Sequence, residues 1–169
     1  MAAHLVSVNV GRVRTVEWHG RPVTTAIWKQ PVAERVYVDF EGLSGDEQAD
    51  PRVHGGPEKA VYAYSADDYA WWEAELRSVL PPGTFGENLT VSGIDVGASV
   101  PGDHWLVGSA VLQVTEPRGP CFKLGLRMGD AAFVKRFAAA GRLGTYLTVI
   151  EPGEIQTGDI VVVRPGGSS

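Results

Sequence analysis

The chain contains a single cysteine, Cys121, and its neighbours could give the thiol reactive chemistry. It lies in the run 116–123, EPRGPCFK, where two prolines and a glycine restrict the backbone and disfavour a helix or central strand. Arg118 and Lys123 place positive charge on either side of the sulfur, and cations stabilise the thiolate that attacks electrophiles or binds a soft metal. Because a lone cysteine is more often a small buried hydrophobic residue, burial in the core is the competing interpretation.

A second stretch, residues 45–60, combines two adjacent glycines with donors that suit an anion. Gly55 and Gly56 allow backbone amides to approach a ligand closely, while Arg52, His54 and Lys59 could hold a phosphate or another anion. The spacing matches neither a Walker loop nor a dinucleotide-binding fingerprint. A solvated surface loop is therefore the competing interpretation.

A third stretch, residues 82–89, contains two glycines and delivers Glu87 and Asn88 to the start of a predicted strand. The Asn88 amide offers both a donor and an acceptor, which suits the edge of a heterocycle such as a pterin. Asparagine also often completes a turn by bonding its own backbone. Both uses of Asn88 stay open at this point.

Composition excludes several classes of protein. One cysteine excludes an intramolecular disulfide, and the four histidines do not have zinc-ligand spacing to Cys121, although His54 could pair with it as a base. The net charge of −5 gives no basic footprint for nucleic acid, and the apolar runs are too short to cross a membrane. Without a recognisable signal peptide, we expect a cytoplasmic protein. The length favours one domain, residues 1–165, with a flexible tail at 166–169.

Apolar residues at alternate positions predict a mainly β chain. The predicted strands are 4–10, 13–18, 23–28, 35–38, 88–91, 110–115, 146–150 and 160–163. One helix is predicted to start at Ser65, which resembles a capping-box residue, and to stop at Pro81. A second is predicted from Asp130 as N-cap to Gly141.

These stretches together resemble the MOSC domain, which is named from the C-terminal domain of molybdenum cofactor sulfurase. The motifs that carry the resemblance are 45–50, 54–62, 85–90, 102–103 and 117–123. It extends from the first predicted strand to about Pro165 and is nearest to small stand-alone bacterial members. The resemblance implies a closed or partly closed β-barrel with a few peripheral helices.

The resemblance also implies roles for individual residues. The family's cysteine serves as a molybdenum ligand or a sulfur carrier, and this role transfers to Cys121. Implied contacts to the molybdenum cofactor, a molybdopterin, are Arg118, Asn88, His54, Gly55, Gly56, Lys59 and Lys123. His54, Glu87 or Asp50 could supply a proton.

Three functions follow as hypotheses. The leading one is an oxidoreductase that reduces N-hydroxylated compounds such as hydroxylated purine bases, with Cys121 as the molybdenum ligand. The chain has no cysteine set for an iron–sulfur cluster and no flavin fingerprint, so electrons would come from a separate electron-transfer protein. The second is a sulfur carrier whose Cys121 persulfide comes from a cysteine desulfurase, with pyridoxal phosphate on that partner only. The third is a non-catalytic molybdopterin-binding module. The oligomeric state is left open.

Overall fold

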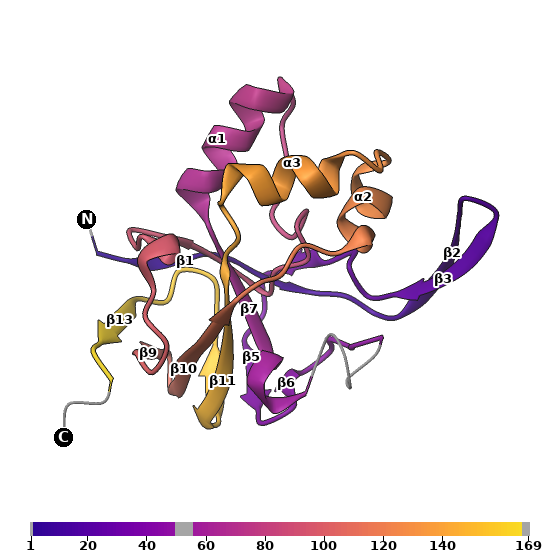
Figure 1. Ribbon diagram of the computed structural model, residues 1–169. Helices are drawn as coiled ribbons and strands as arrows, with labels where there is room; N and C mark the ends of the chain where they lie inside the picture. Colours follow the sequence, from indigo (N-terminus) through magenta and orange to yellow (C-terminus); the bar gives the residue numbers. More distant parts are fainter. Residues whose placement is uncertain (1, 50–55, 167–169) are drawn as a thin grey trace.

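A computed structural model of the chain describes residues 2–49 and 56–166, which form a mainly β structure with three α-helices (Figure 1). The strands are β1 His4–Val10, β2 Arg14–Trp18, β3 Arg21–Thr25, β4 Gln30–Val32, β5 Val36–Asp39, β6 Gly42–Leu43, β7 Val61–Ser65, β8 Leu89–Ser92, β9 His104–Val107, β10 Ala110–Pro117, β11 Thr145–Glu151, β12 Gly153–Ile155 and β13 Val161–Arg164. The helices are α1 Ala66–Leu76, α2 Phe122–Met128 and α3 Phe133–Ala140, and the short 3₁₀ turns are η1 Pro57–Lys59 and η2 Val96–Ala98. No helix in these two ranges is long and apolar enough to span a membrane.

The largest sheet has eight strands in the order β13-β9-β10-β11-β7-β8-β1-β4. Neighbouring strands in this sheet are antiparallel except for the parallel pair β7–β8, which α1 connects along the chain. A small sheet, β12-β5-β6, lies beside it, and the hairpin β2–β3 projects away from the body of the molecule (Figure 1). This topology brings the C-terminal end of β10 close to the helices.

Backbone hydrogen bonds link the β1 side of the large sheet, next to the end strand β4, to the β13 side. Leu5 N donates to Asp159 O at 2.9 Å, Gly158 N donates to Leu5 O at 2.8 Å, and Val161 N donates to Ala3 O at 2.9 Å. These bonds join β1 to the segment that leads into β13. They are local links rather than a continuous strand pairing, so a closed barrel remains a prediction.

The sheet and the helices enclose two cores. The first core lies against the inner face of the large sheet. Alternate residues of its strands, such as Leu5, Leu112 and Leu147, contribute their side chains to this core. The second is an aromatic core between the helices and the sheet, and its members include Tyr64, Trp72, Phe85, Phe133 and Phe137. Leu124 of α2 is fully buried in this second core, so aromatic packing determines where α2 lies.

The predicted helix at Ser65 is confirmed as α1. The Ser65 hydroxyl accepts a hydrogen bond from Asp67 N at 3.1 Å. The helix ends at Leu76 rather than near Pro81, and its C-cap residue Arg77 is left-handed with a φ of 52°. The predicted N-cap at Asp130 is wrong. The Asp130 carboxylate accepts from Ala132 N at 2.9 Å and forms a turn, so α3 begins only after it, at Phe133.

Candidate functional site

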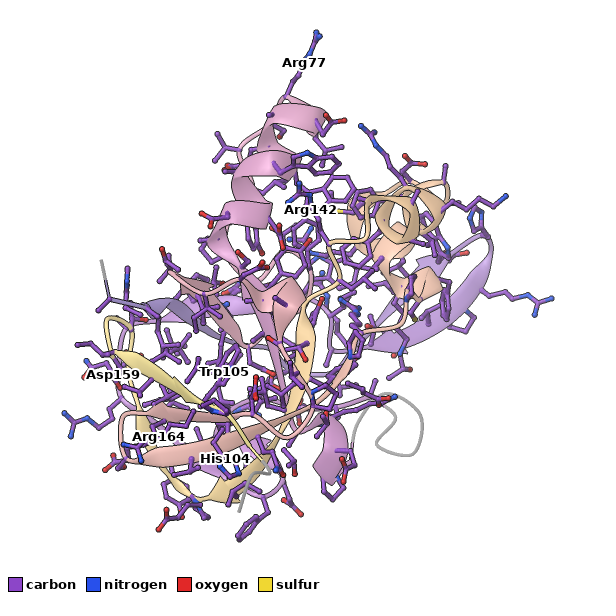
Figure 2. The ribbon with its side chains drawn as sticks, turned by 60° about the vertical axis from the view of Figure 1, so that its left-hand side comes forward. Arg77, His104, Trp105, Arg142, Asp159 and Arg164 are labelled. Carbon is purple, nitrogen blue, oxygen red and sulfur yellow. The ribbon has the colours of Figure 1, made fainter. Side chains whose placement is uncertain are left out.

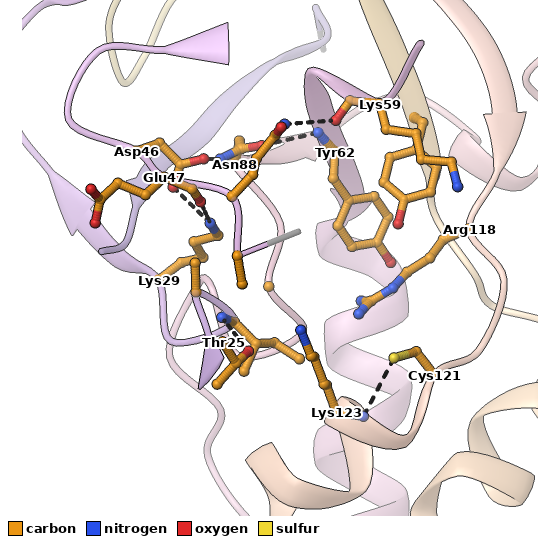
Figure 3. A pocket seen from close by; sticks show the side chains of 16 residues that line it. Thr25, Lys29, Asp46, Glu47, Lys59, Tyr62, Asn88, Arg118, Cys121 and Lys123 are labelled. Atoms are coloured by element: carbon orange, nitrogen blue, oxygen red, sulfur yellow. Dashed lines mark hydrogen bonds and ion pairs between the residues drawn. The ribbon is translucent and has the colours of Figure 1, made fainter. Parts of the chain in front are cut away.

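A pocket of about 100 Å³ lies between the ends of β7 and β10, the start of α2 and the segment after β3 (Figure 3). Five of the residues predicted to form a site line it: Lys59, Asn88, Arg118, Cys121 and Lys123. The other lining residues are Thr25, Ala26, Ile27, Lys29, Asp46, Glu47, Gln48, Ala49, Tyr62, Gly86 and Tyr146. The fold thus brings together side chains that are far apart in the sequence: among the five predicted residues, Lys59 and Lys123 are 64 positions apart.

Cys121 lies between β10 and α2 and is partly exposed. Its Sγ accepts a hydrogen bond from Lys123 N at 3.5 Å, which makes Cys121 the N-cap residue of α2. The prediction that no helix or central strand enters the run 116–123 was wrong, because β10, which lies between β9 and β11, continues to Pro117 and α2 begins at Phe122. The register of β10 shifts before Pro117, and this irregularity accommodates the proline at the strand end. Burial of Cys121 in the core is also wrong, because the thiol lines the pocket.

Arg118 is buried in the wall of the pocket. Its Nη1 donates to the carbonyl oxygen of Phe85, and its guanidinium carbon lies 4.8 Å from the centroid of the Tyr62 ring. The Tyr62 hydroxyl donates in turn to Leu143 O at 2.6 Å. Burial raises the pKa of Tyr62 although Arg118 opposes this shift, so the phenol stays protonated and a donor. Arg118 is therefore a positive charge held in one position.

Lys59 and Lys123 add positive charge on the same side of the pocket as Cys121 (Figure 3). The Lys59 ammonium lies 3.8 Å from a carboxylate oxygen of Glu116 and 5.5 Å from the centroid of the Tyr146 ring. Burial raises the pKa of Tyr146, which therefore contributes a neutral hydroxyl group to this wall. Together with Arg118, the two lysines make this wall cationic in a chain whose net charge is −5.

The opposite wall contains a buried polar network centred on Asp46. Asp46 Oδ1 accepts from Lys29 Nζ at 2.7 Å, and the two side chains are only 7% and 8% exposed. Asn88 Nδ2 donates to Asp46 Oδ2 at 3.0 Å and to Asn9 O at 3.3 Å, while its Oδ1 accepts from Tyr62 N at 3.1 Å. Both Asn88 N–H groups are therefore used within the protein. Asn88 ties β1, β7 and the Asp46 loop together at the pocket, and its contact with a ligand stays a prediction.

Glu87 does not line the pocket. Its neighbours Gly86 and Asn88 do line it, but the Glu87 side chain is buried among other groups. Its Oε2 accepts from Tyr69 Oη at 2.6 Å, Thr90 Oγ1 at 2.8 Å and Gly83 N at 3.2 Å. Complete burial raises the pKa of this carboxyl group. The structure thus places Glu87 inside the protein, away from the position expected of a proton donor.

The twin-glycine loop is described only in part. His54 and Gly55 lie outside the described residues, as do Asp50 and Arg52. Gly56 N donates to Gln48 Oε1 at 3.1 Å, and Gly56 lines a neighbouring hollow of about 400 Å³ rather than the pocket of Cys121. Asp46 and Gln48 line both, so the two spaces adjoin.

The lining residues that sequence reasoning missed include Lys29, Tyr62 and Tyr146. Lys29 gave no signal, since its partner Asp46 is 17 positions away and the pairing arises only in the fold. Tyr62 lies within one of the motifs that carried the resemblance, so the motif itself could have indicated it.

Comparison with known proteins identifies the class of protein that this fold and site define. The sequence profile of the MOSC domain matches residues 50–162. YflK of Bacillus subtilis is 39% identical over 154 residues, which are 91% of this chain and 70% of YflK. YiiM of Escherichia coli is 33% identical over 153 residues, which are 89% of this chain and 67% of YiiM. The chain belongs to the MOSC domain family.

Solved structures agree with this assignment. The crystal structure of YiiM from Geobacillus stearothermophilus matches this fold with a TM-score of 0.79 at 32% identity. The match covers 96% of this chain and 75% of the YiiM chain.

A protein of Gibberella moniliformis called a reductase is 36% identical over 161 residues, which are 93% of this chain but only 28% of that protein. The similarity to that reductase is therefore confined to a minor part of its length.

Proposed function

We propose that this MOSC protein binds the molybdenum cofactor in the pocket of Cys121 and reduces N-hydroxylated compounds in the cytoplasm. One observation carries the proposal: a partly exposed thiol shares a pocket with the cationic side chains of Lys59, Arg118 and Lys123. A thiolate is a soft ligand that suits molybdenum, and cationic donors suit the phosphate of a molybdopterin. The donor set therefore fits the cofactor that the family is associated with.

Each residue has a part in this proposal. Cys121 Sγ would ligate the metal, while Arg118, Lys59 and Lys123 would bind the anionic part of the molybdopterin. Asn88 would keep the two walls in place through its bonds to Tyr62 and Asp46. When bound, molybdenum would supply two-electron redox chemistry.

The reaction also needs protons. Conversion of R–NHOH to R–NH₂ and water consumes two electrons and two protons, and a separate protein would supply the electrons. Within the described part of the pocket, Lys59 and Lys123 would be the candidate proton donors to a bound substrate. His54 keeps its predicted role as a proton donor, without a structural description.

Molybdenum content tests the proposal. Protein made in a host that synthesises the cofactor should contain stoichiometric molybdenum and should reduce an N-hydroxylated purine with reduced methyl viologen as donor. Cys121→Ser should lose both metal and activity, because the alcohol is a much poorer ligand for a soft metal. The measurements are elemental analysis by mass spectrometry and product quantification by chromatography.

Arg164→Met serves as the control, since Arg164 is exposed on β13, does not line the pocket and should not affect metal content. Thermal unfolding of both variants checks that they fold. Metal-free wild-type protein from a competent host, or full metal retention by Cys121→Ser, would contradict the proposal.

The partial exposure of Cys121 also suits the alternative of a sulfur carrier. In that role the thiol would accept sulfane sulfur from a pyridoxal-phosphate-dependent cysteine desulfurase as a persulfide. Mass spectrometry after incubation with a desulfurase and free cysteine should then show one added sulfur at Cys121. A molybdopterin-binding module without activity would give stoichiometric metal but no product.

A further inference from the structure

A row of cationic side chains extends from the pocket to the base of the β2–β3 hairpin. Lys123 and Arg127 are four residues apart on α2 and therefore lie on the same face of the helix. The Arg127 guanidinium lies 5.8 Å from the centroid of the Trp28 ring, and the guanidinium of Arg14 on β2 lies 3.8 Å from the same ring. We call Lys123, Arg127, Trp28 and Arg14 the basic stripe.

The structure shows no ion pair for the cations of the basic stripe within the residues that it describes. Among residues 2–49 and 56–166, no carboxylate lies within ion-pair distance of Lys123, Arg127 or Arg14. Burial lowers the pKa of Arg127; Tyr69 opposes this shift, and the nearby positive charge of Arg14 adds to it. Glu87 acts on Arg127 in the opposite direction, but burial favours the neutral form of Glu87. An external anionic group would therefore relieve an unfavourable concentration of like charges.

The shape of this region suits a protein partner. The hairpin projects from the body of the molecule (Figure 1), and its last residue, Thr25, lines the pocket. In the described part of the chain, β2 and β3 pair only with each other. Phe122, next to Cys121, is 51% exposed although it is a large aromatic residue. Arginine and aromatic side chains are the types that contribute most to protein–protein binding. The surface next to the thiol thus combines aromatic and cationic groups.

We propose that the basic stripe and the β2–β3 hairpin are the docking surface for an acidic electron-transfer protein. This inference rests on the proposed function, which needs electrons from another molecule. The net charge of −5 of the chain disfavours nucleic acid, whereas a folded acidic protein needs positive charge only at its contact patch. In each turnover, two reduced one-electron carriers would each lose one electron, and two protons would complete the conversion of N–OH to N–H and water.

The test uses an acidic plant-type [2Fe–2S] ferredoxin as the probe and the double variant Arg14→Glu/Arg127→Gln. Calorimetry should show that the variant binds ferredoxin roughly tenfold or more weakly than wild type, with a smaller dependence on salt. The KM for reduced ferredoxin should rise in the same way, while turnover with methyl viologen stays unchanged. Arg14→Glu alone should give a smaller effect in the same direction and involves only an exposed residue.

The matched control is Arg77→Glu/Arg164→Gln, which changes the net charge equally. Both of its residues are exposed, and they lie at opposite ends of the molecule, away from each other (Figure 2). Three results would overturn the inference. The stripe variant could bind ferredoxin as tightly as wild type, the control could lose as much ferredoxin affinity as the stripe variant, or wild type could fail to bind ferredoxin. Calorimetry with cofactor-free protein tests ferredoxin binding independently of turnover. If ferredoxin binds as expected but no turnover with methyl viologen occurs, only the proposed function fails.

Discussion

Cys121 occupies the point where the chain leaves β10 and enters α2, so its thiol reaches a pocket rather than the interior of a sheet. Its surroundings are asymmetric. Cations that could hold an anionic ligand lie on its own side, whereas the Lys29–Asp46 pair on the opposite wall is internally neutralised. A ligand with an anionic end and a metal end therefore has a defined orientation in this pocket.

Glu87 makes a prediction about pH and stability. Because burial raises its pKa above the ordinary value of 4.5, the folded protein keeps a proton that the unfolded chain releases above that value. The free energy of unfolding of the wild type should thus fall as pH rises from 4.5 through the raised pKa. Glu87→Gln, which has no such proton, should show a flatter profile, so its stability relative to wild type should increase with pH. Urea denaturation at several pH values between 5 and 8 measures this effect.

Any fixed cost of the Glu87→Gln amide should be independent of pH and should not change the slope. Glu75→Gln provides the control, since Glu75 is an exposed carboxylate on the surface of α1. If Glu87→Gln and wild type lose stability in parallel as pH rises, Glu87 is not the group that titrates.

At the scale of elements, the aromatic core connects the helices to the sheet and thereby positions α2. Phe137 of α3 is fully buried and stacks on Trp72 of α1 at a centroid distance of 6.1 Å, with further ring contacts to Tyr64 and Phe133. Leu124 of α2 packs in the same core. The location of the pocket wall therefore depends on packing between helices as well as on the sheet.

Phe137→Ala should lower the free energy of unfolding by about 3 to 5 kcal/mol, because it removes buried aromatic surface and leaves a cavity. Val79→Ala, at a position that is 85% exposed, should change it by less than about 0.5 kcal/mol. Urea denaturation monitored by tryptophan fluorescence compares the two. A loss near 1 kcal/mol or less for Phe137→Ala would show that the helices are held mainly by other contacts.

For the whole molecule, the hydrogen bonds between β1 and the segment before β13 decide whether the sheet behaves as a closed unit. We expect the amide protons of Leu5, Gly158 and Val161 to exchange as slowly as those of β10, because all three donate between the β1 side and the β13 side of the sheet. Hydrogen–deuterium exchange read by NMR measures this directly. Exchange of these amides at the rate found in the projecting hairpin β2–β3 would show that the ends separate readily.

Local sequence patterns determined much of the fold. The alternation at 4–10 predicted β1 with its observed bounds, and Ser65 marked the start of α1, because both signals arise from interactions within a few residues. The buried run Val61–Ser65 was missed, since β7 is buried on both faces and shows no alternation. α2 was missed because its first turn has Cys121 as N-cap. Cysteine is not a usual N-cap residue, and the prolines just before it disfavour a helix.

The sequence by itself determined that this is a mainly β MOSC protein with one thiol set among cations, because the family motifs and the composition are properties of the chain alone. Only the tertiary structure decided which residues face that thiol. It paired Lys29 with Asp46, used the Asn88 amide to join two walls, and placed Glu87 inside the protein. The physical reason is that burial and partner choice depend on contacts between residues far apart in the chain, which only packing establishes.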